Sequence, residues 1–377
     1  MITVPDNRNQ HYVPKAHLRP FSLNGAGDAI NVLNISSGAL IQNAPTKGQC
    51  SHDYFYGKDG QLEKALQEPE GEYAALVRRS ENEPSSLSED DLKHLLNLTI
   101  LQAFRSFGNV EKLLATVSGF GTAVANPDGE LPRGWGTFTQ ADAVRMAIRH
   151  ALDIREHVAD LDRLLVINEA NSHFVTSDDP AVPTNRYHTQ RVPGVSAGYG
   201  NSGVMLYLPL SPRRLFVAFD PFVYYAPTRE SHVVKIHVDR DVDDLNQFQF
   251  LHARRNIYFS DWASRANVKA ALTAHLPHRP TSWHTTTHWI PSAGDSKDAV
   301  RYVPASEEVA KGYQNSLVQE TLTQVAASRW PSILKYRLKP KVLDTGTGRG
   351  HVRPGHPSLV DRFEDFERRQ RVRFIED

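Results

Sequence analysis

The sequence holds a single cysteine and no excess of charge of either sign. Cys50 is the only cysteine among 377 residues, which excludes an intramolecular disulfide and any zinc site built from several cysteines. Lysine and arginine together number 43, as do aspartate and glutamate, so the formal net charge is +0. No overall field therefore attracts nucleic acid or an anionic membrane, and a polyanionic partner has to be recognised locally. We expect Cys50 to be an ordinary small residue in a reducing compartment.

Long hydrophobic runs are also lacking. No run approaches the roughly 20 apolar residues of a membrane-spanning helix, because charged residues or proline interrupt each candidate within about ten. Residues 1–20 are polar and contain prolines, without the apolar centre of a secretion signal. These features predict a cytoplasmic protein with no membrane partner.

The first half of the chain is predicted to be mainly helical after a small β-hairpin. A short helix is expected over 12–21, followed by two strands over 29–36 and 38–42. Longer helices are expected where apolar residues recur at helical spacing, and Ser88 and Thr139 each precede an aspartate by three residues, as in a capping box. The expected helical segments are 61–67 and 71–82, separated at Pro69, then 88–117 and 139–161.

From about Leu161 the hydrophobic period changes to that of strands. Runs such as RLLVINE, VMLYLPL and RLFVAFD alternate every two residues, and one helix is expected over 241–255. Because helices and strands are segregated, we predict an α+β fold with an N-terminal hairpin, a central helical bundle and an antiparallel β-meander. Residues 1–274 are expected to form one core domain. Residues 275–377 are expected to form a loop-rich extension with one helix, from Ser306 to Arg329, and a basic tail.

Two motifs in this extension suggest chemistry that their context does not support. KVLDTGTGRG, residues 341–350, resembles the glycine loop of nucleotide-fold methyltransferases, yet only residues 351–377 follow it, too few for the further βα units. The spacing of His284 and His288 suits a zinc pair on a helix, but the threonines between them disfavour helix. We interpret the histidines of this patch as solvated loop residues, with metal binding as the alternative: His275, His278, His284 and His288.

A series of motifs resembles an uncharacterised bacterial family, known only as a domain of unknown function. HYVPKAHLRPF, DYFYG, QLEKAL, LQAFR, FVTSDDPAV and PLSP follow one another within about residues 9–262, and the family opens with an HYVP-like motif and carries TSD-x-P after its central helices. His17 falls where the family commonly has an aromatic residue. The resemblance implies no reaction, and only analogy with variable-tailed bacterial families suggests a role in defence. The matching positions are His11, Pro14, Leu18, Phe21, Glu63, Glu72, Gln102, Arg105, Thr176, Ser177, Asp178, Pro180 and Asn246.

Polar residues on an apolar helix are the first candidates for function. Gln102 and Arg105 lie three residues apart on one face of LTILQAFRSF, so burying that face requires partners for both. The expected partner of Arg105 is Glu63, Glu72 or Asp178, or a bound phosphate. An internal ion pair that braces two helices is the structural alternative.

The TSDDP stretch is the second candidate. Pro180 forces Asp179 out of helical geometry, so the strand end presents Thr176, Ser177 and Asp178 at a sharp turn. An Asx turn without any chemistry is the alternative interpretation.

Together these residues predict a hydrolytic site. We expect His11, Glu63, Glu72 and Asp178 to be catalytic, the three carboxylates among them holding a magnesium or manganese ion. Such an ion activates water, which favours a phosphodiesterase or nuclease that acts on nucleic acid or a phosphorylated small molecule. His11 is expected to act as general base or ligand. The substrate is expected to contact Gln102, Arg105, Thr176 and Ser177.

A binding or sensing protein that uses the same polar cleft is the alternative function. Metal chemistry predicts two or more carboxylates within roughly 5 Å of one another and of an imidazole, which binding alone does not require. A third interpretation is a buried polar network that specifies the fold. The basic tail is expected to contact a protein partner or nucleic acid through Arg349, Arg353, Arg368, Arg369, Arg371 and Arg373.

Overall fold

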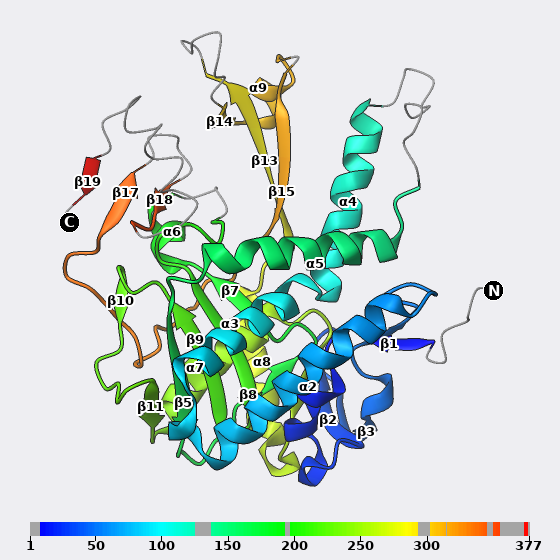
Figure 1. The fold of residues 1–377 in the computed structure, drawn as a ribbon, viewed down its shortest axis with the longest axis vertical. Coiled ribbons are helices and arrows are strands. Elements are labelled where there is room, and N and C mark those ends of the chain that lie inside the picture. The colour runs from blue at the N-terminus through cyan, green and yellow to red at the C-terminus, as the bar shows by residue number, and fades with distance from the viewer. Residues whose placement is uncertain are drawn as a thin grey trace.

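A five-stranded mixed sheet lies at the centre of the molecule (Figure 1). Its strand order is β11-β5-β9-β8-β7, with β11 parallel to β5 and all other pairs antiparallel. Of the strands expected for the antiparallel meander, β8 and β9 pair directly, whereas β11 is parallel to β5. The strands are β5 (Asp162–Asn168), β7 (Val182–Thr184), β8 (Met205–Ser211), β9 (Arg214–Phe219) and β11 (Val233–Ile236). The computed structural model describes residues 8–124, 137–192, 197–292, 302–313, 315–344, 350–354 and 373–375.

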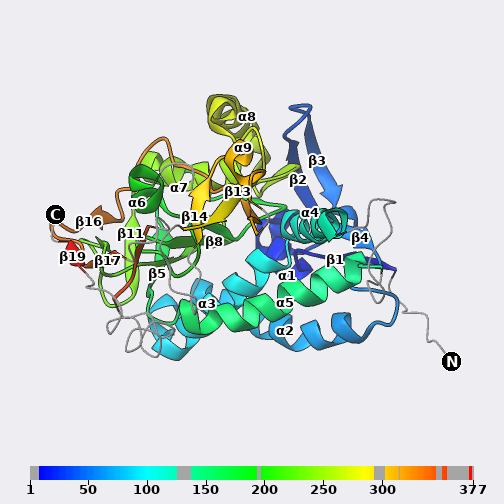
Figure 2. The ribbon, with the colours of Figure 1, turned by 90° about the horizontal axis from the view of Figure 1, so that it is seen from above.

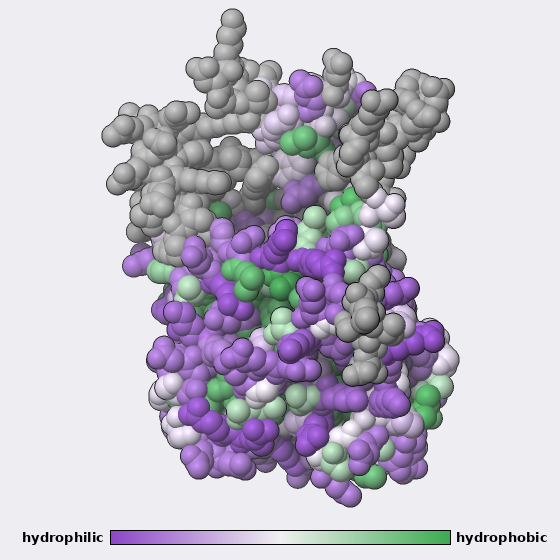
Figure 3. Space-filling view, turned by 45° about the vertical axis from the view of Figure 1, so that its right-hand side comes forward, coloured by the Kyte–Doolittle hydropathy of each residue, from purple (hydrophilic) through white to green (hydrophobic). Residues whose placement is uncertain are grey.

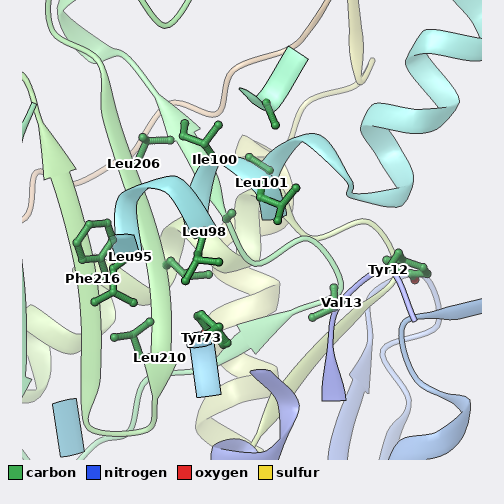
Figure 4. Close-up of a cluster of buried hydrophobic side chains, with 14 of the residues drawn as sticks. Tyr12, Val13, Tyr73, Leu95, Leu98, Ile100, Leu101, Leu206, Leu210 and Phe216 are labelled. Atoms are coloured by element: carbon green, nitrogen blue, oxygen red, sulfur yellow. The ribbon is translucent and has the colours of Figure 1, made fainter. Parts of the chain in front are cut away.

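The side chains of β8 point alternately to the two faces of the sheet, and both faces are buried. Leu206, Leu208 and Leu210 belong to the same hydrophobic cluster as the leucines of α3 (Figure 4). Tyr207 points to the opposite face and stacks on Phe248 of α7, with ring centroids 4.2 Å apart. Because successive side chains of a strand alternate in direction, one apolar run serves both layers. Figure 2 shows α2, α3 and α5 on one side of the sheet and α7 on the other, which confirms the α+β class.

The helices on the first face begin where the sequence predicts. Ser88 and Thr139 cap α3 and α5 with the expected capping boxes, in which Asp91 and Asp142 bond back to the cap. The main helices are α2 (Gln61–Asn82), α3 (Glu89–Phe104), α4 (Phe107–Val124), α5 (Gln140–His157), α7 (Asp239–His252) and α8 (Arg265–His275).

Two helix boundaries differ from the prediction. Helix α2 continues through Pro69, so the separation expected there is wrong. The single helix expected over 88–117 is broken at Arg105 and Ser106 into α3 and α4. Asn109 stabilises the break, because its side chain donates to the Phe104 carbonyl and its backbone N–H donates to Ser106 Oγ. The break turns Arg105 into the interior, where it is buried.

A second sheet joins the N-terminal hairpin to the end of α7. Its order is β3-β2-β12-β6, and the predicted hairpin of the first two strands is confirmed. Pairing of β6 with β12 brings TSDDP beside the C-terminus of α7. The strands of this sheet are β2 (Ala29–Asn34), β3 (Leu40–Pro45), β6 (Thr176–Ser177) and β12 (Asn256–Phe259). The remaining elements before residue 275 are β1 (Asn9–His11), α1 (Lys15–Leu18), β4 (Ser51–Asp53), α6 (Arg186–Arg191) and β10 (Tyr224–Tyr225).

The C-terminal extension differs most from its prediction. The helix expected from Ser306 to Arg329 is wrong: only α9 (Glu307–Ala310) is helical, and β15 (Leu317–Leu322) pairs with β13 (His284–Pro291). Valine and threonine favour strand pairing there over a helix. His284 and His288 therefore lie on a strand, and His275 is buried in α8. The other strands are β14 (Tyr302–Ala305), β16 (Lys335–Tyr336), β17 (Val342–Asp344), β18 (His351–Val352) and β19 (Arg373–Ile375).

The extension also packs against the core. Val325, Ile333, Leu334 and Val342 belong to the hydrophobic cluster of α7 and the central sheet. The boundary at 274/275 stays a prediction. Arg353 corrects the basic-tail expectation, because it is fully buried and pairs with Asp160 instead of facing a partner. Of the other arginines of the tail, Arg349, Arg368, Arg369 and Arg371 lie outside the described residues, and only the backbone of Arg373 is described.

The face of the molecule drawn in Figure 3 is mostly hydrophilic, with hydrophobic residues in small groups. Among the described helices, none combines the length and apolar character needed to cross a membrane. Cys50 is buried, and its thiol donates to the Tyr258 hydroxyl.

Candidate functional site

Arg105 is held by an internal ion pair with a carboxylate that the sequence analysis did not consider. Its Nη1 lies 2.8 Å from Glu70 Oε1, and its Nε donates to Gln102 Oε1 at 3.0 Å. Gln102 in turn donates to the Tyr12 carbonyl at 3.1 Å. The pair joins α3 to α2, so the helix-bracing alternative describes this arginine, and Glu63, Glu72 and Asp178 are not its partners.

His17 contacts a predicted substrate-binding residue, Thr176. The two ring nitrogens of His17 lie 2.7 Å from the hydroxyls of Tyr73 and Thr176. Burial, with a smaller effect of Arg105, lowers the pKa of His17 to about 3. A neutral, fully hydrogen-bonded imidazole in this position joins α1, α2 and β6. His17 is therefore a structural residue of the polar network, a role that its position in the sequence did not indicate.

Ser177 and Asp178 have partners within the fold. Ser177 Oγ donates to Gln249 of α7 at 2.7 Å. The Asp178 carboxylate accepts backbone N–H groups of Arg254, Arg255 and Asn256, at 3.0, 2.9 and 3.4 Å. Burial, with the neighbouring Asp179 charge, raises the pKa of Asp178 to about 6 despite these donors. Asp178 thus holds the turn between α7 and β12.

The expected metal ligands do not converge. Glu63 accepts from Gln10 at 3.1 Å, Glu72 lies 3.0 Å from His94, and Asp178 holds a backbone turn. Within the described part of the chain, no group of three or more His, Cys, Asp or Glu side chains is arranged to hold a metal ion. These three carboxylates therefore do not fit a shared magnesium or manganese ion.

His11 is half-buried and is not brought to that set of carboxylates. Its Nε2 atom is buried and has no hydrogen-bond partner among the described residues. Burial lowers the pKa of His11, and the charge of Lys15 lowers it further. The catalytic role of His11 stays a prediction.

The most unusual polar group is centred on Asp179, directly after the predicted aspartate. Asp179 is 2% exposed, and within the described chain neither of its carboxylate oxygens accepts a hydrogen bond. His252 Nε2 lies 3.4 Å and Arg254 Nε 3.7 Å from Asp179 Oδ2, beyond ordinary hydrogen-bond lengths. Nδ1 of His252 and two guanidinium nitrogens of Arg254 are also buried without a described hydrogen-bond partner. Buried unsatisfied groups are rare in folded proteins, so their concentration here makes this group a candidate site.

Aromatic and glycine contacts hold Arg254 in place. Its guanidinium lies over the Trp283 ring, 3.9 Å from the centroid, while burial lowers the pKa of Arg254 and Asp179 raises it in part. The guanidinium also passes so close to Gly108 of α4 that a Cβ there would lie 2.7 Å from Nε. The break between α3 and α4 and the tryptophan of the extension therefore both shape this site.

A cavity of about 170 Å³ adjoins the group at His252. The cavity lies between α4, the end of α7 and the chain after β15, and its wall combines aromatic, amide and cationic side chains. The residues that define its chemistry are Phe104, Asn109, Lys112, Tyr199, His252 and Gln324. An acid, an imidazole and two cations near one hollow can bind an anion and move a proton.

The sequence carried one signal for this site and lacked the others. Asp179 stands in the TSDDP stretch, but alternation along the strand could not tell which aspartate faces His252 and Arg254. His252 and Arg254 lie at the end of a helix expected from periodicity alone, and no motif marked them. Their distance from Asp179 in the sequence hides the contact, because only the pairing of β6 with β12 creates it.

Comparison with protein families identifies the chain. Residues 9–262 match the model of a family described as "Protein of unknown function (DUF4238)", and the chain belongs to this family. Comparison with curated proteins and with solved structures gives no match. The family assignment agrees with the resemblance seen in the sequence and adds no reaction to it.

Proposed function

We propose that this member of the DUF4238 family hydrolyses phosphate esters, as a phosphodiesterase or nuclease, and that its active site is the cavity at His252. The observation that carries the proposal is the buried group of Asp179, His252 and Arg254, whose polar atoms lack hydrogen bonds beside a hollow. Folding alone gains nothing from leaving such groups unsatisfied, whereas an anionic substrate would accept hydrogen bonds from the Arg254 guanidinium.

The charges around the cavity suit a phosphate group. Arg254 presents a fork of donors held by Trp283, and Lys112 brings a second positive charge to the cavity wall. Both cations would stabilise the negative charge that develops on the phosphoryl oxygens as a water attacks phosphorus.

His252 is the proposed general base. Its Nδ1 would take a proton from the attacking water, while Asp179 at Nε2 would stabilise the imidazolium that forms. The bond from phosphorus to the leaving oxygen then breaks, and that oxygen is protonated from solvent or by the imidazolium.

The proposal derives no step from a metal ion. The magnesium or manganese dependence expected from the sequence rests on Glu63, Glu72 and Asp178, which have separate partners. It is tested in the same assay by comparing both ions with a chelator.

The test is cleavage of labelled RNA and DNA and of a chromogenic phosphodiester. His252→Ala is expected to lower kcat/KM by about 10²–10⁴-fold because it removes the base. Asp179→Asn is expected to lower kcat while leaving the fold intact. His278→Ala, at an exposed position, is the histidine control that keeps activity, and His11→Ala tests the catalytic role predicted for His11 from the sequence.

Two outcomes would contradict this assignment. Loss of activity in His11→Ala with retention in His252→Ala would return the reaction to the site predicted from the sequence. Absence of product from the wild type with either metal ion or with chelator would reject a phosphoesterase.

A binding protein without turnover is the second candidate, favoured by one distance. The 3.4 Å between Asp179 and His252 is longer than the hydrogen bond that orients a catalytic imidazole. A protein of this second kind would bind phosphorylated ligands at the cavity with an affinity that His252→Ala lowers, and would release them unchanged.

A further inference from the structure

One amide of the C-terminal extension presents a fixed acceptor at the cavity. Gln324 lines the cavity, and its Nε2 donates to the carbonyl of Ala197 at 3.1 Å. This bond fixes which end of the carboxamide is the oxygen. The Oε1 atom is buried and accepts no hydrogen bond from the described residues. A ligand with an N–H group would satisfy that oxygen, and a ligand with an acceptor in its place would be repelled.

Besides this polar acceptor, the cavity has a flat apolar surface. Phe104 and Tyr199 both line it, and their rings stack with centroids 5.5 Å apart and planes 29° from parallel. Ala103, Pro183 and Val204 complete an apolar lining. Aromatic side chains of this kind accept the flat face of a base by stacking.

Two cationic side chains, Lys112 and Arg254, lie near this cavity. Lys112 belongs to its wall, and Arg254 is close to His252 through their common neighbour Asp179. A ligand that joins a flat ring, an N–H donor and an anionic group would use the acceptor, the aromatic wall and the cations together. A nucleotide has all three parts.

We infer that the cavity recognises a nucleotide whose base carries an amino group at the ring carbon where hypoxanthine and uracil carry an oxygen, as adenine and cytosine do, and that Gln324 reads this group. The inference rests on the proposed function for the phosphate and adds the identity of the base. The nucleotide can be a free monophosphate or the end of a strand, since the same atoms are presented by both.

The recognising residue lies outside the family match. Residues 9–262 match the family model and contain Asp179, His252 and Arg254, whereas Gln324 and Trp283 come from the extension. The matched region thus supplies the polar group, and the extension supplies the selective contact with the base.

The experiment is calorimetric binding of nucleotide pairs to the full chain. Adenosine monophosphate is compared with inosine monophosphate, and cytidine monophosphate with uridine monophosphate, because each pair differs by an amino group against an oxygen. The amino member is expected to bind about tenfold more tightly or better. The dinucleotide ApA, compared with the free monophosphate, distinguishes a strand end from a free nucleotide.

Variants of Gln324 assign the preference to its oxygen. Gln324→Leu keeps the size but removes the acceptor, and is expected to abolish the preference within each pair. Gln319→Leu, on the exposed part of β15, is the matched control that should leave binding unchanged.

Equal binding of both members of each pair, a preference that survives in Gln324→Leu, or no binding of any nucleotide would each overturn the inference. Cleavage of the labelled substrates combined with any of these results leaves the phosphoesterase proposal intact. If the protein prefers the amino member of each pair through Gln324 but cleaves no substrate, the inference about the base stands and the hydrolysis proposal is rejected.

Discussion

Two adjacent aspartates have opposite roles at the residue scale. Asp178 accepts three backbone N–H groups and secures the turn after α7, while Asp179 receives no hydrogen bond from described side chains and faces His252 and Arg254. Both are almost fully buried. A carboxylate bonded by backbone N–H groups contributes to folding, whereas one that faces His252 and Arg254 only at 3.4 and 3.7 Å is buried at a cost that is less fully offset.

His17 makes the stability of the fold sensitive to acid. Its pKa is about 3 in the folded protein, against 6.5 for the unperturbed side chain, because burial disfavours the charged ring. The unfolded chain therefore binds a proton below pH 6.5 that the folded chain does not. The contribution of His17 is complete above that pH and is lost as the pH falls toward 3, by at most about 1.4 kcal/mol per pH unit.

Replacement by phenylalanine tests this contribution. His17→Phe is expected to cost about 2–4 kcal/mol at pH 7, because the hydroxyls of Tyr73 and Thr176 lose their partner. Urea unfolding at pH 7 and pH 5 should show that the difference from wild type narrows at the lower pH. The control His278→Gln, at an exposed position, should keep wild-type stability at pH 7. An unchanged difference at both pH values would contradict the assignment.

At the scale of elements, the break between α3 and α4 shapes both polar regions. It turns Arg105 inward to Glu70 and places Gly108 beneath the Arg254 guanidinium. The continuous helix predicted from periodicity has no such break beside the Arg254 guanidinium. The absence of a Cβ at Gly108 is what permits the arginine to lie there.

Two glycine-to-alanine changes separate helix stability from site geometry. Gly108→Ala should leave the free energy of unfolding within about 1 kcal/mol of wild type, since helix propensity improves while only a side-chain end is displaced. The same change is expected to weaken phosphate binding or hydrolysis about tenfold, because Arg254 must move. Gly71→Ala in α2, where a Cβ meets nothing within 4 Å, should gain stability and keep activity. Unfolding curves and the assays above measure both, and full activity in Gly108→Ala would contradict the role of Arg254.

At the scale of the whole molecule, Arg353 joins the extension to the core. Its guanidinium bonds to the Asp160 carboxylate at 2.8 and 3.0 Å and to the carbonyls of His157, Tyr199 and Asn201. Tyr199 is part of the cavity wall. This buried arginine therefore positions the wall from a segment 154 residues away from Tyr199.

Removing that charge should loosen the extension. Arg353→Met leaves Asp160 without its cation and is expected to cost about 3–5 kcal/mol. Amide hydrogen exchange should increase at residues 350–354 and 197–204, and the exposed Lys339→Met should change neither. Unaltered exchange at 197–204 would show that Arg353 does not support the cavity wall.

Local patterns in the sequence determined the class of the fold and several of its boundaries. The capping residues Ser88 and Thr139, the hairpin of β2 and β3 and the alternation along β8 depend on neighbours within a few residues, so they are readable without the fold. The secondary structure of the C-terminal extension was harder to predict, because the pairing of β15 with β13 overrides local preference.

The tertiary structure alone decided which polar residues meet. Arg105 pairs with Glu70 instead of the three carboxylates expected, and Thr176 bonds to His17. Asp179 reaches His252 only because β6 pairs with β12 at the end of α7. Hydrophobic period and capping act over one or two turns of chain, whereas these contacts join residues tens to hundreds of positions apart. The candidate site is therefore a property of strand pairing and burial, to which the sequence contributes its residue types but no distances.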